Sequence, residues 1–373
     1  MSDPEGVDAW EVMKARLPPL PAEHQARLDA LMKRARKPLA PGDPRRHHFL
    51  PQFFQRRFAD DEERLVVVPV DGGCQRLTRI RNIAVVSDLY TLVDEEVGET
   101  VALERVLAEL DGQAAGALER LVNSTSVPDD SDRGTLACWL AFQSVRDPYT
   151  RRTMEALADQ LLKLDLSPAA DPEVARARLR RVHGREPTDE EVGEIVDAAT
   201  HLDEIEVAPH QNDFIKIMLD TGLAMVPHFL RRKVVLLRFR EPGLVLCDRP
   251  IALRQYDRHR RPGRGFGVID ADEILVPLDR RTAMALHDDP MIGEAIIEDP
   301  PVSVDNFNQC IVSNANAEVY CHPDDVVRLE ALELPMPGRP LLMVDETTRL
   351  SVNTDGVNSA PIRKRHRRYR GRQ

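Results

Sequence analysis

The chain lacks several features that would assign it to a large protein class at once. No run of about 18 apolar residues occurs, so the sequence predicts no membrane-spanning helix. The first ten residues are acidic and contain no apolar segment, so we expect no signal peptide and a cytoplasmic protein. Phosphate-binding glycine-rich loops, the G-x-S-x-G turn and kinase signatures are all absent, which excludes the enzyme classes that depend on them.

Metal-binding and disulfide patterns are also missing. The five cysteines are scattered without a C-x-x-C pair, and the histidines form no H-E-x-x-H motif. We therefore expect reduced thiols and no cysteine-based zinc site. No metal and no cofactor is indicated by any motif.

Positive charge is unevenly distributed along the chain. The net charge is −11, yet the tail from Arg363 to Arg372 holds seven Lys and Arg and no acid, which leaves −18 for the rest. A second basic stretch, predicted to be a loop, runs from Arg254 to Arg264. This asymmetry predicts a basic arm that contacts nucleic acid, another anionic partner or the acidic body of the chain itself. The alternative is a tail that only increases solubility.

Proline-rich segments predict the domain organisation. Residues 1–44 are expected to form a peripheral helix (22–37) and a linker. Residues 45–322 are expected to form one large core domain with a helical insertion at about 168–205. Residues 323–373 are expected to be a loosely structured extension that ends in the basic tail 363–372.

Periodicity predicts an α+β fold, with helices in the middle of the chain and small hairpins before and after them. Predicted helices span 99–122, 131–146, 148–166, 172–184, 188–202 and 210–230, and another begins at Ser303 or Asp305. An early hairpin is predicted from 65–68 and 75–80, and a late hairpin from 234–237 and 244–247. Short strands are predicted at 274–276 and 283–286. Residues 179–191 resemble a helix–turn–helix segment of bacterial sigma factors, and good capping chemistry around Thr188 and Glu191 explains the same pattern as a helical insertion.

Residues 47–58 form the most unusual segment, which we call the histidine box. It contains two histidines, two arginines and four of the ten phenylalanines in a chain with only 5% aromatic residues. We expect His48 and Gln52 to take part in chemistry, and His47 to be a solvent-side neighbour of His48. The phenylalanines are predicted to pack in the core, while Arg56 and Arg57 are predicted to be surface groups or members of ion pairs.

Five short motifs follow one another between residues 45 and 322. The first is His48-Phe49-Leu50-Pro51-Gln52, and the later four are Phe142-Gln143-x-x-Arg146-x-Pro148, Asp248-x-Pro250, Pro277-Leu278 and the helix that contains Asn308. Together they resemble the bacterial family catalogued as domain of unknown function 4238. That resemblance implies a soluble, mostly prokaryotic protein without an assigned activity. The chain departs from the family at Gln55, Cys247 and Asp279, where leucine, serine and serine are usual.

One interpretation of these motifs is a shared catalytic pocket. His48 would act as acid or base, Asp248 would orient it, and Arg146 would bind an anion. Gln52, Gln143 and Asn308 would bind the substrate through hydrogen bonds. This arrangement predicts a hydrolase that acts on a nucleotide or a nucleic-acid phosphodiester.

The alternative interpretation is structural. A buried polar group that lacks a partner costs about 1–3 kcal/mol, so such residues often cross-link a fold by hydrogen bonds. Gln143 would then bind a backbone carbonyl, Asp248 would form a turn, and Arg146 would pair with an acid such as Glu104. This interpretation predicts a non-catalytic binding or interaction protein with a structural polar network and a basic arm.

Overall fold

The computed structural model describes residues 38–94, 98–206, 210–256, 259, 266–336 and 363–364. The fold is α+β, as predicted. The described residues form two compact units. One contains 151–206, 210–214 and 363–364, and the other contains 38–94, 98–150, 215–256, 259 and 266–336. The predicted helix at 22–37, most of the basic loop and the tail beyond residue 364 lie outside the described residues. The predicted domain bounds remain predictions.

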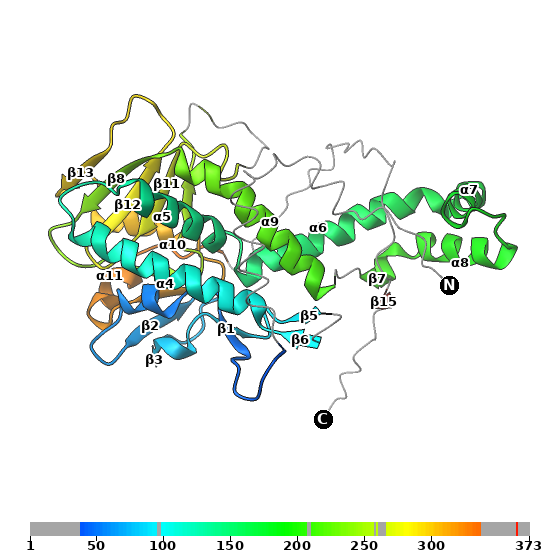
Figure 1. The fold of residues 1–373 in the computed structure, drawn as a ribbon, viewed down its shortest axis with the longest axis horizontal. Helices are drawn as coiled ribbons and strands as arrows, with labels where there is room; N and C mark the ends of the chain where they lie inside the picture. The colour runs from blue at the N-terminus through cyan, green and yellow to red at the C-terminus, as the bar shows by residue number, and fades with distance from the viewer. Residues whose placement is uncertain are drawn as a thin grey trace. The chain divides into compact units, whose positions relative to one another are not determined.

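Two sheets form the centre of the larger unit (Figure 1). The five-stranded sheet is mixed, because β13 runs parallel to β8 while all other strand pairs of the sheet are antiparallel. Its strands, in spatial order, are β10 (Ala252–Arg254), β11 (Glu273–Pro277), β12 (Thr282–His287), β8 (Lys233–Arg238) and β13 (Ala295–Glu298). The four-stranded sheet has the order β3 (Arg76–Arg79), β2 (Arg64–Pro69), β14 (Glu318–Cys321) and β9 (Leu246–Cys247). Two-stranded ribbons pair β1 (Arg46–His48) with β4 (Val85–Ser87) and β5 (Leu92–Asp94) with β6 (Gly98–Thr100).

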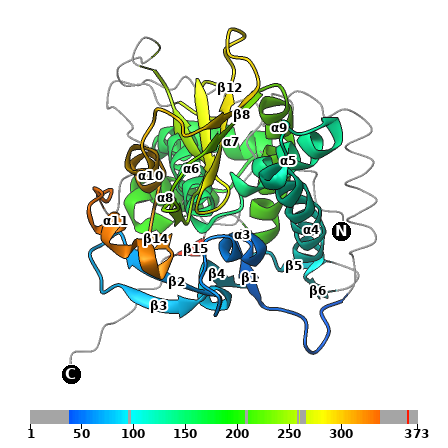
Figure 2. The ribbon, with the colours of Figure 1, turned by 90° about the vertical axis from the view of Figure 1, so that its left-hand side faces the viewer.

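Helices cover both faces of the five-stranded sheet (Figure 2). On one face lie α5 (Asp130–Gln143) and α9 (Gln211–Leu230), whose Leu136 and Phe229 line a small apolar hollow with Met284 of the sheet. On the other face lies α10 (Val304–Val312), where the Phe307 ring packs 5.9 Å from that of Phe239. The remaining helices of this unit are α3 (Gln52–Arg56), α4 (Ala102–Asn123) and α11 (Val326–Glu330).

The structure confirms the predicted early hairpin but not the predicted late hairpin. Strands β2 and β3 pair across a turn in which Gly72 has a φ of 80°, a conformation that favours glycine. In contrast, β8 and β9 belong to different sheets, since β8 pairs with β12 while β9 pairs with β14. The intervening residues Gly243 and Leu244 donate their backbone N–H groups to the Arg280 carbonyl instead of closing a hairpin. Two adjacent apolar runs cannot reveal that their partners lie elsewhere in the chain.

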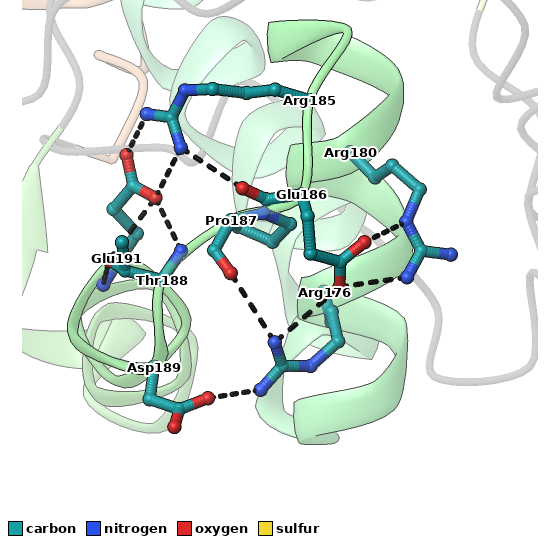
Figure 3. Close-up of polar contacts among 8 residues, drawn as sticks. All are labelled: Arg176, Arg180, Arg185, Glu186, Pro187, Thr188, Asp189 and Glu191. Atoms are coloured by element: carbon teal, nitrogen blue, oxygen red, sulfur yellow. Dashed lines mark hydrogen bonds and ion pairs between the residues drawn. The ribbon is translucent and has the colours of Figure 1, made fainter.

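The smaller unit contains a helical hairpin of α7 (Pro172–His183) and α8 (Asp189–Thr200), which follow α6 (Pro148–Leu166). Its small core consists of Ala169, Ala175, Leu179, Val192 and Ala199. The predicted capping box between Thr188 and Glu191 is confirmed. Figure 3 shows that arginines of α7 and of the turn pair with acids nearby, as Arg180 does with Glu186 at 2.6 Å. These local contacts explain why residues 179–191 form a helix–turn–helix hairpin. In the same unit, β7 (Ile205–Glu206) pairs with β15 (Arg363–Lys364).

Replacing Gly222 by alanine tests how closely α5 and α9 approach. A Cβ at this position would lie 2.9 Å from the ring of Phe142. Overpacking of this kind costs about 1–3 kcal/mol, which exceeds the gain of about 1 kcal/mol in helix propensity. We therefore expect Gly222→Ala to lower the denaturation midpoint.

The matched control is Gly112→Ala in α4, where an added Cβ meets nothing within 4 Å. This variant should be more stable than the parent by about 0.5–1 kcal/mol. Equal stabilisation by both substitutions would show that the two helices are not in tight contact.

Candidate functional site

Arg146 is the centre of a buried polar cluster at the junction of α5 and α6. Its side chain is only 1% exposed. The guanidinium donates to both carboxylate oxygens of Asp111, at 3.0 and 3.2 Å, and from Nε to Gln143 Oε1 at 2.8 Å. Trp139 Nε1 donates to the same Asp111 carboxylate. Arg146 therefore has a dedicated carboxylate and amide partner within the protein.

The junction has a local cause in the sequence. Helix α6 begins at Pro148, and a proline is well suited to the first turn of a helix. Asp147, directly before it, accepts the backbone N–H groups of Tyr149 and Thr150 at 2.8 and 2.9 Å, as N-cap residues do. The cap starts a new helix directly after α5. Arg146 therefore lies in the short connection between the two helices, where its side chain reaches Asp111 of α4.

Gln143 connects this cluster to the histidine box. Its Nε2 donates to the Phe49 carbonyl at 3.0 Å, while its Oε1 accepts from Arg146. Tyr90 adds a further link, because its hydroxyl donates to the Arg146 carbonyl at 2.8 Å. The cluster thus joins α5, the box and the segment before β5.

His47 is buried, so its predicted position on the solvent side is wrong. Its Nδ1 accepts the backbone N–H of Tyr90 at 2.9 Å, and Nε2 lies 3.1 Å from the Pro44 carbonyl. The ring stacks on that of Tyr90, with centroids 5.4 Å apart. These contacts fit a neutral imidazole that donates from Nε2, and burial lowers the pKa of His47. Side chains alternate along β1, which places the adjacent His48 on the other side of the strand.

The predictions for the phenylalanines and arginines of the histidine box agree with the structure. Phe54 and Phe58 are fully buried, and the Phe53 and Phe54 rings pack on Trp139 of α5, which confirms their core role. Arg56 and Arg57 form ion pairs with Glu63 and Glu119, also as predicted.

His48 and Gln52 are both half-buried. The His48 ring makes a hydrogen bond with the backbone of Arg81, while its Nε2 is buried and has no partner among the described residues. Burial is the main cause of the lowered pKa of His48. Gln52 is the first residue of α3, and its side chain makes no hydrogen bond with any described residue. His48 Nε2 is therefore a polar atom of the box that the fold leaves without a partner.

Asp248 and Asn308 each bind the backbone of another segment. The Asp248 carboxylate accepts the N–H groups of Asn316 and Ala317 at 2.9 and 2.7 Å. Burial nevertheless raises the pKa of Asp248 to about 6. Asn308 accepts from the Val245 N–H at 3.1 Å and donates to the Gly243 carbonyl at 2.8 Å. These bonds attach the residues around β9 to the turn before β14 and to α10.

The structure brings together some of the predicted site residues. Gln143 and Arg146 are in direct contact, and Asp147, next to Arg146, is close enough to Asp248 to raise its pKa. Within the described ranges, no hydrogen bond or ion pair joins His48, Arg146 and Asp248. The catalytic roles assigned to these three residues remain predictions.

Two acidic residues of α4 complete the cluster around Arg146. Asp111, rather than Glu104, is the ion-pair partner of Arg146, at 3.0 Å. Glu104 lies two turns earlier on the same helix and interacts electrostatically with both. Burial and Asp111 raise the pKa of Glu104 to about 7, although Arg146 opposes the shift. The seven-residue spacing of these acids on a predicted helix was a signal for Asp111 in the sequence.

The described residues show neither a metal-binding cluster nor a membrane-spanning helix. No group of three or more His, Cys, Asp or Glu side chains among them is arranged to hold a metal ion. None of their helices is both long enough and apolar enough to cross a membrane.

Comparison with known proteins gives one match. Residues 46–325 match the model of the family described as a protein of unknown function, DUF4238. No curated protein and no solved structure matches the chain. The matched range includes the histidine box, the Arg146 cluster, Asp248 and Asn308.

Replacing Asn308 by leucine tests its structural role. The substitution leaves the Val245 N–H and the Gly243 carbonyl without their partner in a buried region. Each unsatisfied group costs about 1–3 kcal/mol, so we expect a loss of about 2–5 kcal/mol in the free energy of unfolding measured with urea. Asn306→Ala, at an exposed position of the same helix, should change stability by about 0.5 kcal/mol or less. A small effect of Asn308→Leu would contradict the cross-linking role.

Replacing Glu104 by glutamine tests the shifted pKa. The folded protein binds this proton more tightly than the unfolded chain, so the parent should lose stability as the pH rises from 4.5 towards 7. Glu104→Gln removes this loss. Its stability relative to the parent should therefore increase by up to about 3 kcal/mol between pH 4.5 and pH 8.

Urea denaturation at both pH values measures this difference. Glu109→Gln, at an exposed position of α4, controls for the removal of one negative charge from the helix. A difference between Glu104→Gln and the parent that stays constant with pH would show that the Glu104 carboxyl has an ordinary pKa.

Proposed function

The chain belongs to the DUF4238 family of proteins of unknown function, and we propose that it is a non-catalytic binding protein for an anionic partner. One observation carries this proposal. Gln143, Asp248 and Asn308, which the sequence marks as site residues, use their side chains to bind backbone groups of other segments. A structural polar network therefore explains why these residues stand in apolar motifs.

The hydrogen bonds of Arg146 and Asp248 also argue against catalysis by these two residues. A catalytic group needs an atom that can reach the substrate. Both Asp248 oxygens accept backbone N–H groups, and the Arg146 guanidinium is enclosed by Asp111 and Gln143. Binding of a substrate anion to Arg146 would have to displace the Asp111 carboxylate.

The anionic nature of the partner follows from the charge distribution. Residues 363–372 carry seven Lys and Arg, and the stretch from Arg254 to Arg264 is also basic, in a chain with a net charge of −11. Clusters of this kind bind phosphate groups of nucleic acid or other anionic surfaces, with a strength that falls as salt increases. Nucleic acid is the partner class we propose to test first.

A second function, hydrolysis of an anionic ester, is favoured by Glu104. Its carboxyl has no hydrogen-bond partner in the part of the chain that the structure describes, it lies beside Arg146, and its pKa of about 7 suits a general acid or base. The unpartnered Nε2 of His48 is a second atom available for proton transfer. Glu104 and His48 are therefore the side chains to replace in an activity test.

Incubation of the full chain with RNA, DNA and nucleotides, with and without divalent metals, tests the proposal. We expect no degradation, together with nucleic-acid binding that weakens as salt increases. Deletion of residues 363–373 should weaken this binding at low salt and reduce the steepness of its salt dependence.

Degradation of a substrate would contradict the proposal. If the chain degrades one of these substrates, and Glu104→Gln or His48→Ala abolishes the activity without lowering the melting temperature, the hydrolase replaces the binding protein. If the tail deletion leaves nucleic-acid binding unchanged, the tail is not the binding arm.

A further inference from the structure

A second buried arginine lies at one end of the five-stranded sheet, where α9 ends and β8 begins. The side chain of Arg232 is fully buried. Its Nη2 donates to the carbonyls of Val268 and Ala271 at 2.7 and 2.8 Å. Its Nε and Nη1 are also buried, and neither has a hydrogen-bond partner in the part of the chain that the structure describes. The guanidinium therefore retains unsatisfied N–H donors inside the protein.

Among the described residues, no carboxylate forms an ion pair with the Arg232 guanidinium. The nearest acids act on it only electrostatically and are engaged elsewhere. Asp288 pairs with Arg231 at 2.7 Å, and Asp272 binds the Tyr256 N–H and His259. An arginine stays protonated even when burial lowers its pKa, as it does here. Because a buried charge is unfavourable unless it is paired, this environment favours a bound anion.

Two histidines near Arg232 each have one buried ring nitrogen without a partner among the described residues, although Nε2 of His287 faces Glu273 at 3.5 Å. His228 lies one helical turn before Arg232, and His287 of β12 lies opposite Lys233 in the strand register. In each ring Nδ1 is buried and has no partner. Within the described residues, four of the six buried polar side-chain atoms without a partner belong to these three side chains.

Burial is the main cause of the lowered pKa of both histidines. Arg231 and then Arg232 add to the lowering at His228. At His287, Glu273 opposes the lowering and Arg232 adds to it.

We propose that Arg232, together with His228 and His287, binds a small oxyanion of the phosphate class. A water molecule could satisfy the free N–H groups, but only an anion would also balance the buried charge. A phosphate oxygen accepts hydrogen bonds from the free N–H groups of the Arg232 guanidinium, and from a histidine Nδ1 when that ring is protonated. His287 Nε2 lies 3.5 Å from Glu273 Oε1, so its Nδ1 donates in the imidazolium form, which a bound anion favours.

The route to the site is a short surface turn. Val268 and Ala271, which accept from Arg232, belong to the segment that follows the basic stretch ending at Arg264. Residues 266, 267, 269 and 270 of this turn are exposed. An anion attracted by the basic stretch would therefore reach Arg232 by displacing the two carbonyls of this turn, and the site is independent of the tail.

Titration of the full chain with inorganic phosphate, followed by calorimetry and by the melting temperature, tests this site. We expect saturable binding and a saturable rise in melting temperature, whereas chloride at equal ionic strength should produce neither. Arg232→Met should weaken phosphate binding by about tenfold or more, because it removes charged hydrogen bonds. Arg79→Met, which removes an exposed arginine from β3 in the other sheet, is the matched control and should leave binding unchanged.

A second variant keeps the proposal testable if Arg232→Met does not fold. His287→Gln removes the imidazole but keeps a polar side chain, and it should weaken phosphate binding several-fold while the protein remains folded. The absence of saturable phosphate binding in the parent, or unchanged binding in a folded Arg232→Met or His287→Gln variant, would overturn the proposal. Deletion of residues 363–373 should not affect phosphate binding, so failure of the tail as a nucleic-acid arm and failure of this site are distinguishable.

Discussion

Hydrogen bonds between buried side chains and backbone groups connect segments of this fold at positions outside the strand ladders. Gln143 attaches α5 to the histidine box, Asp248 attaches the end of β9 to the turn before β14, and Asn308 attaches α10 to the residues before β9. Such segments carry backbone N–H and C=O groups that no strand partner satisfies. Because an unsatisfied buried group is costly, the packing of these elements depends on the side chains that bind them.

Two fully buried arginines show how differently one residue type is accommodated. Arg146 binds the Asp111 carboxylate, which Trp139 also binds, and the Gln143 amide, so its charge and its donors are matched within the protein. Arg232 is bound only by two neutral carbonyls. Both are large charged side chains in the interior, but only the second has donors and a charge left for a ligand. Motif position pointed to Arg146, whereas the local environment points to Arg232.

Much of the fold was predictable because its causes are local. The capping box at Thr188, the hairpin of β2 and β3, and helices such as α6 depend on residues within a few positions of one another. The prediction of the late hairpin was wrong because β8 pairs with β12 and β9 pairs with β14, and both partners follow much later in the chain. The prediction that His47 lies on the solvent side was wrong for a similar reason. Its burial depends on contacts with Pro44 and with Tyr90, which lies 43 residues away.

The sequence by itself determined the α+β class, the family and the polar residues of the five motifs, because periodicity, capping and motif order depend on residue type and position along the chain. It could not decide whether those residues perform chemistry or satisfy the backbone. Only the tertiary structure showed that Gln143, Asp248 and Asn308 are bound to distant backbone groups, and that Arg232 retains free donors. The physical reason is that the free energy of a buried polar atom depends on its neighbours in space, and those neighbours come from segments far apart in the chain.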